Sequence, residues 1–259
     1  QNWLKYQARC QYLLQEGLFV ADVCFYCGES APNSVWGGSL MTGYDYDACS
    51  TDALLKLMSV KDGRIVLPNG MSYRMLVLPN DKAMTPGVLR KIKELVDAGA
   101  TVLGPKPEKS YGLVGYPKCD EEVMSLAAEV WGKAVTDKSP AEVLAAMGVK
   151  PDFEFSNKAA RIVYIHRVVN GADVYFVSNQ KQTVDESECT FRVSGKAPEL
   201  WHPDTGRIEK APVYREEGGR TTVPLRFDPA GSVFVVFRKP AGADHIVAVS
   251  RTAVGDKKE

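Results

Sequence analysis

Residues Ser72 to Pro107 read SYRMLVLPNDKAMTPGVLRKIKELVDAGATVLGPKP, the pattern of a strand, a loop, a helix and a second strand. The first run, Tyr73 to Leu78, is apolar except at Arg74. An almost continuous apolar run of this length is typical of a parallel strand covered on both faces. The stretch therefore predicts a buried central strand.

The helix that follows is amphipathic. Thr85 and Pro86 supply an N-cap and a first-turn proline, and Gly99 ends the segment. Ala100 to Leu103 then returns as a short β-rich run, which completes a βαβ unit of ordinary length. The apolar residues at helical spacing are Val88, Leu89, Ile92, Leu95 and Val96.

The composition is that of an ordinary globular protein: 259 residues, 45% apolar and 25% charged. This length suits one large or two medium domains, and we expect two. The 32 basic and 32 acidic residues balance and no basic face stands out, so neither nucleic acid nor membrane is expected as a partner. No apolar run is long enough to span a membrane. Because the chain does not begin with Met, we expect a mature product or a piece of a longer protein.

Alternating helices and strands are predicted up to about residue 150. The expected helices are 2–17, one capped by Ser50, 120–131, and 141–147 with a capping box at Ser139 and Glu142. The expected strands before the central one are 19–26 and 45–49, followed by a small hairpin. Between them, residues 28–43 form a long Gly-, Ser- and Pro-rich loop, a type that is often functional.

From Arg161 onward the chain is β-rich in short bursts separated by turn signals such as Asn-Gly and Pro-Asp-Thr-Gly, which predicts a β-sandwich. The predicted fold class is therefore α/β plus β: a flavodoxin-like or amidotransferase-like parallel-sheet domain followed by a β-sandwich. The domains are 1–155, with 1–17 as a connector helix, and 156–250. Residues 251–259 are expected to be a disordered tail.

Ligands bind to open parallel sheets at the carboxyl ends of the strands, so we searched those ends. They offer Glu29 and Trp36, then Tyr44-Asp45-Tyr46-Asp47, then Asn80 and Asp81, and finally residues 104–107. No dinucleotide fingerprint or phosphate loop is present, and no cofactor is expected. An amidotransferase would need a cysteine on a strand-to-helix elbow with a histidine base, but all three histidines, His166, His202 and His245, lie in the β half.

The tetrapeptide Tyr44-Asp45-Tyr46-Asp47 is the main candidate for substrate binding, with Glu29 and Trp36 beside it. In an extended segment Asp45 and Asp47 lie on one face, roughly 6.6 Å apart, and the tyrosines on the other. Paired carboxylates with aromatic rings suit a sugar or a calcium ion. The alternative, and the favoured one, is a strand end with solvated aspartates and core tyrosines.

Two further motifs have simpler interpretations. Trp201 and His202 precede a turn and are expected to be a hairpin with a packed aromatic, with a sugar platform as the alternative. Cys24 and Cys27 form a C-x-x-C pair within a strand, where residues three apart point to opposite faces, so we expect free thiols and no metal site.

Several segments together resemble one family. They are YLLQEGLFVADVCFYCGE, GYDYDACSTDALL, KDGRIVLPNGMSYRMLVLP, MTPGVLRKIKELVDAGATVLGPKP, ADVYFVSNQ and PELWHPDTG. Nearly the whole chain resembles the C-terminal region of family 106 glycoside hydrolases, which are bacterial α-L-rhamnosidase-like enzymes. In that family a catalytic barrel is followed by a flavodoxin-like domain and β-sandwiches. The resemblance implies that the catalytic carboxylates belong to the barrel, so no catalytic residue is carried onto this chain.

Two functions follow from the resemblance. The chain is expected to be the non-catalytic C-terminal portion of a secreted or periplasmic glycoside hydrolase, with its own barrel as partner and with the loop at 28–47 closing the substrate cleft. The alternative is a stand-alone carbohydrate-binding or oligomerisation module. Fold analogy alone does not decide between these functions.

Overall fold

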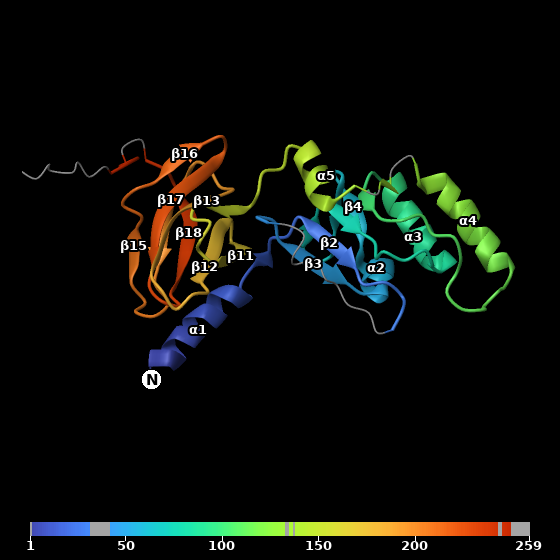
Figure 1. The fold of residues 1–259 in the computed structure, drawn as a ribbon, viewed down its shortest axis with the longest axis horizontal. Coiled ribbons are helices and arrows are strands. Elements are labelled where there is room, and N and C mark those ends of the chain that lie inside the picture. Colours follow the sequence, from blue (N-terminus) through green and yellow to red (C-terminus); the bar gives the residue numbers. More distant parts are fainter. Residues whose placement is uncertain (1, 32–41, 133–134, 137, 243–244, 250–259) are drawn as a thin grey trace, which may run out of the picture. The chain divides into compact units, whose positions relative to one another are not determined.

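The computed structural model describes residues 2–31, 42–132, 135–136, 138–242 and 245–249. The chain divides into two compact units (Figure 1): Leu18–Pro151, the α/β unit, and Gln1–Gly17 with Asp152–Glu259, the β unit. The boundary at 151 and 152 lies close to the one expected from the sequence.

The α/β unit is built on a five-stranded parallel sheet in the order β3-β2-β7-β8-β9. In chain order the strands lie as 2-1-3-4-5. Leu76 in the central strand is fully buried and pairs with Cys24 on one side and Val102 on the other. The predicted central strand is confirmed. The strands are β2 (Val23–Tyr26), β3 (Tyr46–Cys49), β7 (Met75–Val77), β8 (Thr101–Leu103) and β9 (Val135–Thr136).

The expected single strand Tyr73–Leu78 is divided. Tyr73 belongs to β6 (Ser72–Tyr73), which pairs antiparallel with β5 (Arg64–Val66), and β5 pairs in turn with β4 (Ser59–Lys61). Only β7 enters the parallel sheet, and between the two strands the backbone N–H of Arg74 donates to the carbonyl of Asp22 at 2.8 Å. The apolar run is therefore shared between two sheets. Tyr73 pairs in the antiparallel sheet, and Met75–Val77 pairs in the parallel sheet.

Three helices of this unit begin where their caps predict, whereas the helix Lys118–Val130 has no side-chain cap and begins before its predicted start at Asp120. The side chain of Ser50 accepts from Ala53 N, that of Thr85 accepts from Val88 N, and Ser139 forms the capping box with Glu142. The helices are α2 (Thr51–Leu57), α3 (Pro86–Asp97), α4 (Lys118–Val130) and α5 (Pro140–Ala146).

The β unit consists of two antiparallel sheets in the orders β11-β12-β18-β14-β15 and β10-β13-β17-β16. Tyr175, Phe191, Leu225 and Val235, drawn from both sheets, lie in one buried core, as in a β-sandwich. The strands are β10 (Phe153–Phe155), β11 (Ile162–Val169), β12 (Ala172–Asn179), β13 (Asp185–Phe191), β14 (Lys196–Trp201), β15 (Ile208–Lys210), β16 (Arg215–Glu217), β17 (Arg220–Phe227) and β18 (Ser232–Pro240).

The N-terminal helix α1 (Asn2–Gln15) corrects the expected domain map, because it belongs with the β unit rather than with the α/β domain. Its Cys10 packs against Val174 and Phe234, and the Tyr6 hydroxyl lies 2.9 Å from Ser232 Oγ. Gly17 ends the helix at a φ of 63°, so close to β11 that a Cβ there would lie 2.1 Å from Val168 O. Strand β1 (Leu18–Phe19) follows.

Candidate functional site

The carboxyl edge of the parallel sheet holds Glu29, just after β2. Its carboxylate accepts hydrogen bonds from the Thr85 backbone N–H at 2.8 Å and from the Thr85 hydroxyl at 2.6 Å. Thr85 is the N-cap of α3, and β2 and β7 are the neighbouring strands at which the chain order of the sheet reverses. Ligand anions bind other doubly wound proteins at such a helix N-terminus. Here the protein's own carboxylate occupies that position.

Asp81, which follows β7, is also engaged. It accepts from the Tyr111 hydroxyl and from Ala83 N at 2.9 Å, while its neighbour Asn80 is exposed. The hydrogen bond from Tyr111 holds the pKa of Asp81 below its usual value. Burial, together with Asp81, raises the pKa of Tyr111 to about 12. This carboxyl is therefore kept ionised, the opposite of what a general acid requires.

The tetrapeptide Tyr44–Asp47 lies at the other edge of the sheet. Strand β3 begins at Tyr46, which pairs with Val23, the first residue of the parallel strand β2. The tetrapeptide thus sits at the amino ends, whereas Glu29 follows the carboxyl end of β2. The sequence predicts both at one edge of the sheet, but the parallel register separates them. Trp36 lies outside the described residues.

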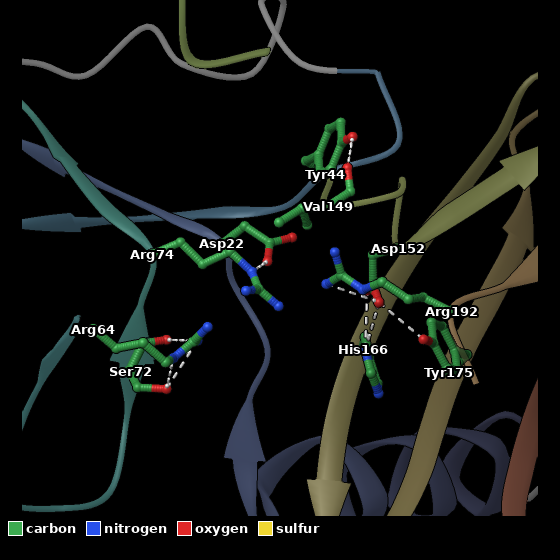
Figure 2. A network of polar contacts seen from close by, with 10 residues as sticks. All are labelled: Asp22, Tyr44, Arg64, Ser72, Arg74, Val149, Asp152, His166, Tyr175 and Arg192. Atoms are coloured by element: carbon green, nitrogen blue, oxygen red, sulfur yellow. Dashed lines mark hydrogen bonds and ion pairs between the residues drawn. The ribbon is translucent and has the colours of Figure 1, made fainter. Parts of the chain in front are cut away.

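Each side chain of the tetrapeptide contacts its own unit. The Tyr44 hydroxyl donates to Val149 O at 2.8 Å (Figure 2), and Tyr46 packs edge-on against Phe25. Asp45 accepts from Tyr46 N at 2.9 Å, and Asp47 accepts from the Tyr73 hydroxyl at 2.8 Å. Burial is the largest cause that raises the pKa of Tyr73, and the hydrogen bond to Asp47 raises it further.

A buried ion pair at this amino edge was missed by the sequence search. Asp22 is 2% exposed, and its Oδ1 accepts from Arg74 Nε at 2.8 Å (Figure 2). Its backbone N–H donates to Asp45 O at 3.1 Å. The signal was present in the sequence, since Arg74 interrupts an apolar run and Asp22 stands before another. The pairing itself requires the register of β2 and β7.

The most buried polar cluster lies in the β unit around His166, which is 4% exposed. Its Nδ1 lies 3.0 Å from Asp152 Oδ2, and its Nε2 lies 3.3 Å from Asp173 Oδ1. The Tyr175 hydroxyl donates to Asp152 at 2.9 Å, and its ring stacks on the imidazole at 3.8 Å (Figure 2). Arg192 adds an ion pair to Asp152 at 3.3 Å.

The largest single influence on the pKa of His166 is burial, which lowers it because burial disfavours the charged imidazolium. Asp152 and Asp173 together outweigh burial and raise the pKa above 6.5. Since both ring nitrogens face carboxylates, both donate when the ring is protonated. This arrangement resembles an acid–base relay, yet its buried members bond to one another and leave no free group for a substrate. We interpret it as a structural network of the core.

The cysteines do not add a reactive centre. All six are free thiols, and Cys24 is fully buried in β2 while Cys27 follows that strand and is only partly buried. Burial raises the pKa of Cys27, which disfavours a reactive thiolate. Within the described ranges, no group of three His, Cys, Asp or Glu side chains is placed to hold a metal ion.

Residues 1–216 match the glycoside hydrolase 106 family, described as alpha-L-rhamnosidase. The chain belongs to this family. The resemblance found in the sequence is confirmed.

Two individual relatives match nearly the whole chain. A rhamnosidase from Novosphingobium sp. PP1Y superposes with a TM-score of 0.85 and 35% identity over 97% of this chain and 25% of that enzyme. A putative beta-glucuronidase from Formosa agariphila is 39% identical over 241 residues, which are 91% of this chain and 21% of that protein. The chain thus spans about a quarter or less of these relatives.

A more distant solved structure shares the fold. An alpha-L-fucosidase isoenzyme 2 from Paenibacillus thiaminolyticus has a TM-score of 0.52 at 8% identity, over 92% of this chain and 51% of that enzyme. At this identity the likeness shows the shared fold alone.

Proposed function

We propose that this chain is the non-catalytic C-terminal portion of a bacterial glycoside hydrolase related to α-L-rhamnosidases, where it supports the catalytic barrel and its substrate cleft. The observation that carries the proposal is the coverage: the match includes nearly all of this chain but only 25% of the Novosphingobium rhamnosidase.

The carboxylates of the described residues support a non-catalytic role. Glycosidases generally place two carboxyl groups about 5 to 9.5 Å apart on either side of a bound sugar, one of them kept protonated. Here Glu29 caps a helix, Asp81 is held ionised, and Asp152 lies in the His166 network. Each of the three carboxylates thus accepts hydrogen bonds from groups of its own unit.

The α/β unit is proposed to be a flavodoxin-like accessory domain. Its 2-1-3-4-5 strand order is the flavodoxin order, and the position used by ligands in that fold is occupied by Glu29 and Thr85. A domain with this strand order, in which the protein's own side chains lie at the usual ligand position, forms contacts with other domains rather than catalysing a reaction. Its partner in the proposal is the barrel of the same protein.

The proposed location is the periplasm or the cell exterior. Membership of a glycoside hydrolase family supports it. In the described part of the chain, no helix combines the length and the apolar character that crossing a bilayer requires.

A second candidate is a stand-alone carbohydrate-binding or oligomerisation module. The loop between β8 and α4 favours assembly, because Leu113, Val114 and Tyr116 are 80%, 91% and 63% exposed. A pocket lined by Trp201 favours binding of carbohydrate.

The test compares three proteins: this 259-residue chain, the complete product of its gene, and that product truncated before Asn2. Each is assayed on aryl α-L-rhamnosides and a panel of other aryl glycosides. We expect turnover by the complete product, none by this chain, and reduced stability of the truncated form. The proposal would be overturned if this chain alone turned over an aryl glycoside and the double variant Asp45→Ala, Asp47→Ala did not.

The loop at 28–47 is tested in the complete product. If it closes the cleft, Asp45→Ala or Tyr46→Ala raises KM for the aryl glycoside with little change in kcat. Exposed Asp62→Ala, on the hairpin turn between β4 and β5, serves as the control. Unchanged kinetics would confine the tetrapeptide to a structural role.

A further inference from the structure

A pocket of about 250 Å³ lies within the β unit, between helix α1 and the turn that joins β14 to β15. The helix contributes Arg9 and Tyr12 to the lining, and the strands and their turn contribute Trp201, His202, Arg207 and Ile208. Pockets for drug-sized molecules typically measure about 300 to 1,000 Å³, so this one suits a single sugar ring.

The walls of the pocket are aromatic and aliphatic. Tyr12 is 67% exposed and Ile208 is 53% exposed, although both line the hollow. Trp201 is held in place, because its Nε1 donates to Glu199 at 3.0 Å and the Arg238 guanidinium lies 5.1 Å from its ring centroid. A fixed tryptophan beside an exposed tyrosine provides rigid apolar surface at low entropic cost.

Arg9 provides a charged side chain in the lining of the pocket. Its Nη1 donates to the carbonyl oxygens of Pro203 at 2.8 Å and Asp204 at 2.9 Å. Gly206, at a φ of 81°, allows the guanidinium to lie against the turn, because a Cβ there would come within 2.8 Å of Arg9 Nη2. The turn therefore fixes the guanidinium at the pocket through its backbone.

The charge of Arg9 distinguishes it from its neighbours. Arg207 and His202 both contact Glu209, at 3.0 and 2.9 Å. Arg9 has two carbonyl partners, and among the described residues no carboxylate forms an ion pair with it. A positioned guanidinium without a carboxylate partner is suited to binding an anionic group from a ligand.

We propose that this pocket binds a saccharide unit that carries a carboxylate, that is, a uronic acid residue. The sugar ring packs on Trp201 and Tyr12, and Arg9 binds the carboxylate. The inference rests on the proposed function only for its choice of a carbohydrate, and it assigns this binding to the β unit rather than to the barrel.

The experiment titrates the 259-residue chain with methyl β-D-glucuronide and with methyl β-D-glucoside, two probes that differ only at the carboxylate, using ligand-observed NMR or calorimetry. Tyr12→Ala removes an exposed wall, and Tyr116→Ala, of equal chemistry and similar exposure in the α/β unit, is its matched control. We expect the glucuronide to bind more tightly than the glucoside. We expect Tyr12→Ala to weaken it by at least about fivefold and Tyr116→Ala to leave it unchanged.

Arg9→Gln tests the charge, with Arg90→Gln on α3 as its control. Loss of a charge-assisted hydrogen bond should lower affinity for the glucuronide at least about tenfold while the glucoside is unaffected. Circular dichroism establishes that each variant is folded. If Arg9→Gln is unfolded, salt dependence replaces it: wild-type affinity for the glucuronide should fall between about 50 and about 500 mM salt, because screening weakens a charge contact.

Absence of glucuronide binding, equal affinity for the two probes, or equal effects of Tyr12→Ala and Tyr116→Ala would each overturn the proposed pocket function. None of these results bears on the accessory role, which is measured by the activity of the complete and truncated proteins.

Discussion

The carboxylate of Glu29 accepts hydrogen bonds from both the backbone N–H and the hydroxyl of Thr85, at 2.8 and 2.6 Å, and so joins the loop after β2 to the N-terminus of α3. The contact spans the point at which the strand order of the sheet reverses. Other proteins of this architecture bind substrates or cofactors at this position.

The first prediction concerns this contact. Glu29→Ala should lower the free energy of unfolding of the α/β unit by about 1 to 2 kcal/mol, because it removes a charge-assisted cap from two donors. Urea denaturation measures the change. Glu108→Ala, which breaks only an exposed ion pair with Lys82, should cost less than about 0.5 kcal/mol. Equal losses for the two variants would contradict the assignment.

The second prediction concerns pH. The pKa of His166 is raised in the folded protein, so its stabilising contribution is complete below about pH 6.5, the value in the unfolded chain. The contribution is lost as the pH rises through the folded value. Thermal unfolding of the β unit, followed from about pH 6 to about pH 9, should therefore show declining stability.

Two variants identify the group responsible. His166→Gln should be less stable overall and should lose the alkaline decline, whereas His202→Gln should retain it. At acid pH the dependence of stability on pH has the opposite sign, because of Asp173. Burial is the largest influence on the pKa of Asp173 and raises it, but hydrogen bonds from His166 and Lys196 outweigh burial and lower that pKa. Its contribution is lost as the pH falls through that lowered value. An alkaline decline that persists in His166→Gln would refute the assignment.

The third prediction concerns the central strand. Leu76 is fully buried in β7, so Leu76→Ala should cost about 2 to 5 kcal/mol, the usual range for a leucine in a packed core. Leu113→Ala, at a site 80% exposed, should change stability by less than about 0.5 kcal/mol. Chemical denaturation decides, and a loss below about 1 kcal/mol for Leu76→Ala would mean that β7 is not the centre of the sheet.

The fourth prediction concerns the domain boundary. Limited proteolysis should cut first near residues 147–151, where the α/β unit ends. Because α1 packs on the β unit through Cys10 and Leu14, the two fragments should elute together until urea separates them. Leu14→Asp should lower the urea concentration at which they separate, whereas Leu4→Asp, at a position 67% exposed, should not. First cleavage inside 72–107 would contradict the domain map.

Much of the fold was predictable because its signals are local. The caps at Ser50, Thr85 and Ser139 satisfy the first N–H groups of their own helices, so their role can be recognised within four residues of sequence. The βαβ unit and the antiparallel half follow from hydrophobic periods of 3.6 and 2. The family resemblance was likewise carried by contiguous segments and is confirmed by the match over residues 1–216.

The candidate site was less predictable, since it depends on which ends of different strands coincide. The spacing in Tyr44–Asp47 showed which side chains alternate, but the pairing of Tyr46 with Val23 places them at the amino edge, away from Glu29. A strand pattern specifies faces and does not specify register. The role of Glu29 as a helix cap likewise depends on Thr85, which is 56 residues away.

The sequence by itself determined that a parallel α/β half is followed by an antiparallel β half, the central position of β7, the starts of α2, α3 and α5, and the family, because each of these depends on neighbours along the chain. Only the tertiary structure decided that α1 belongs to the β unit, that Arg74 divides an apolar run by pairing with Asp22, and that Arg9 meets the turn at Pro203. An amphipathic pattern states which face of an element is buried but not against what, and these partners, which lie 52 or more residues apart in the chain, are brought together only by folding.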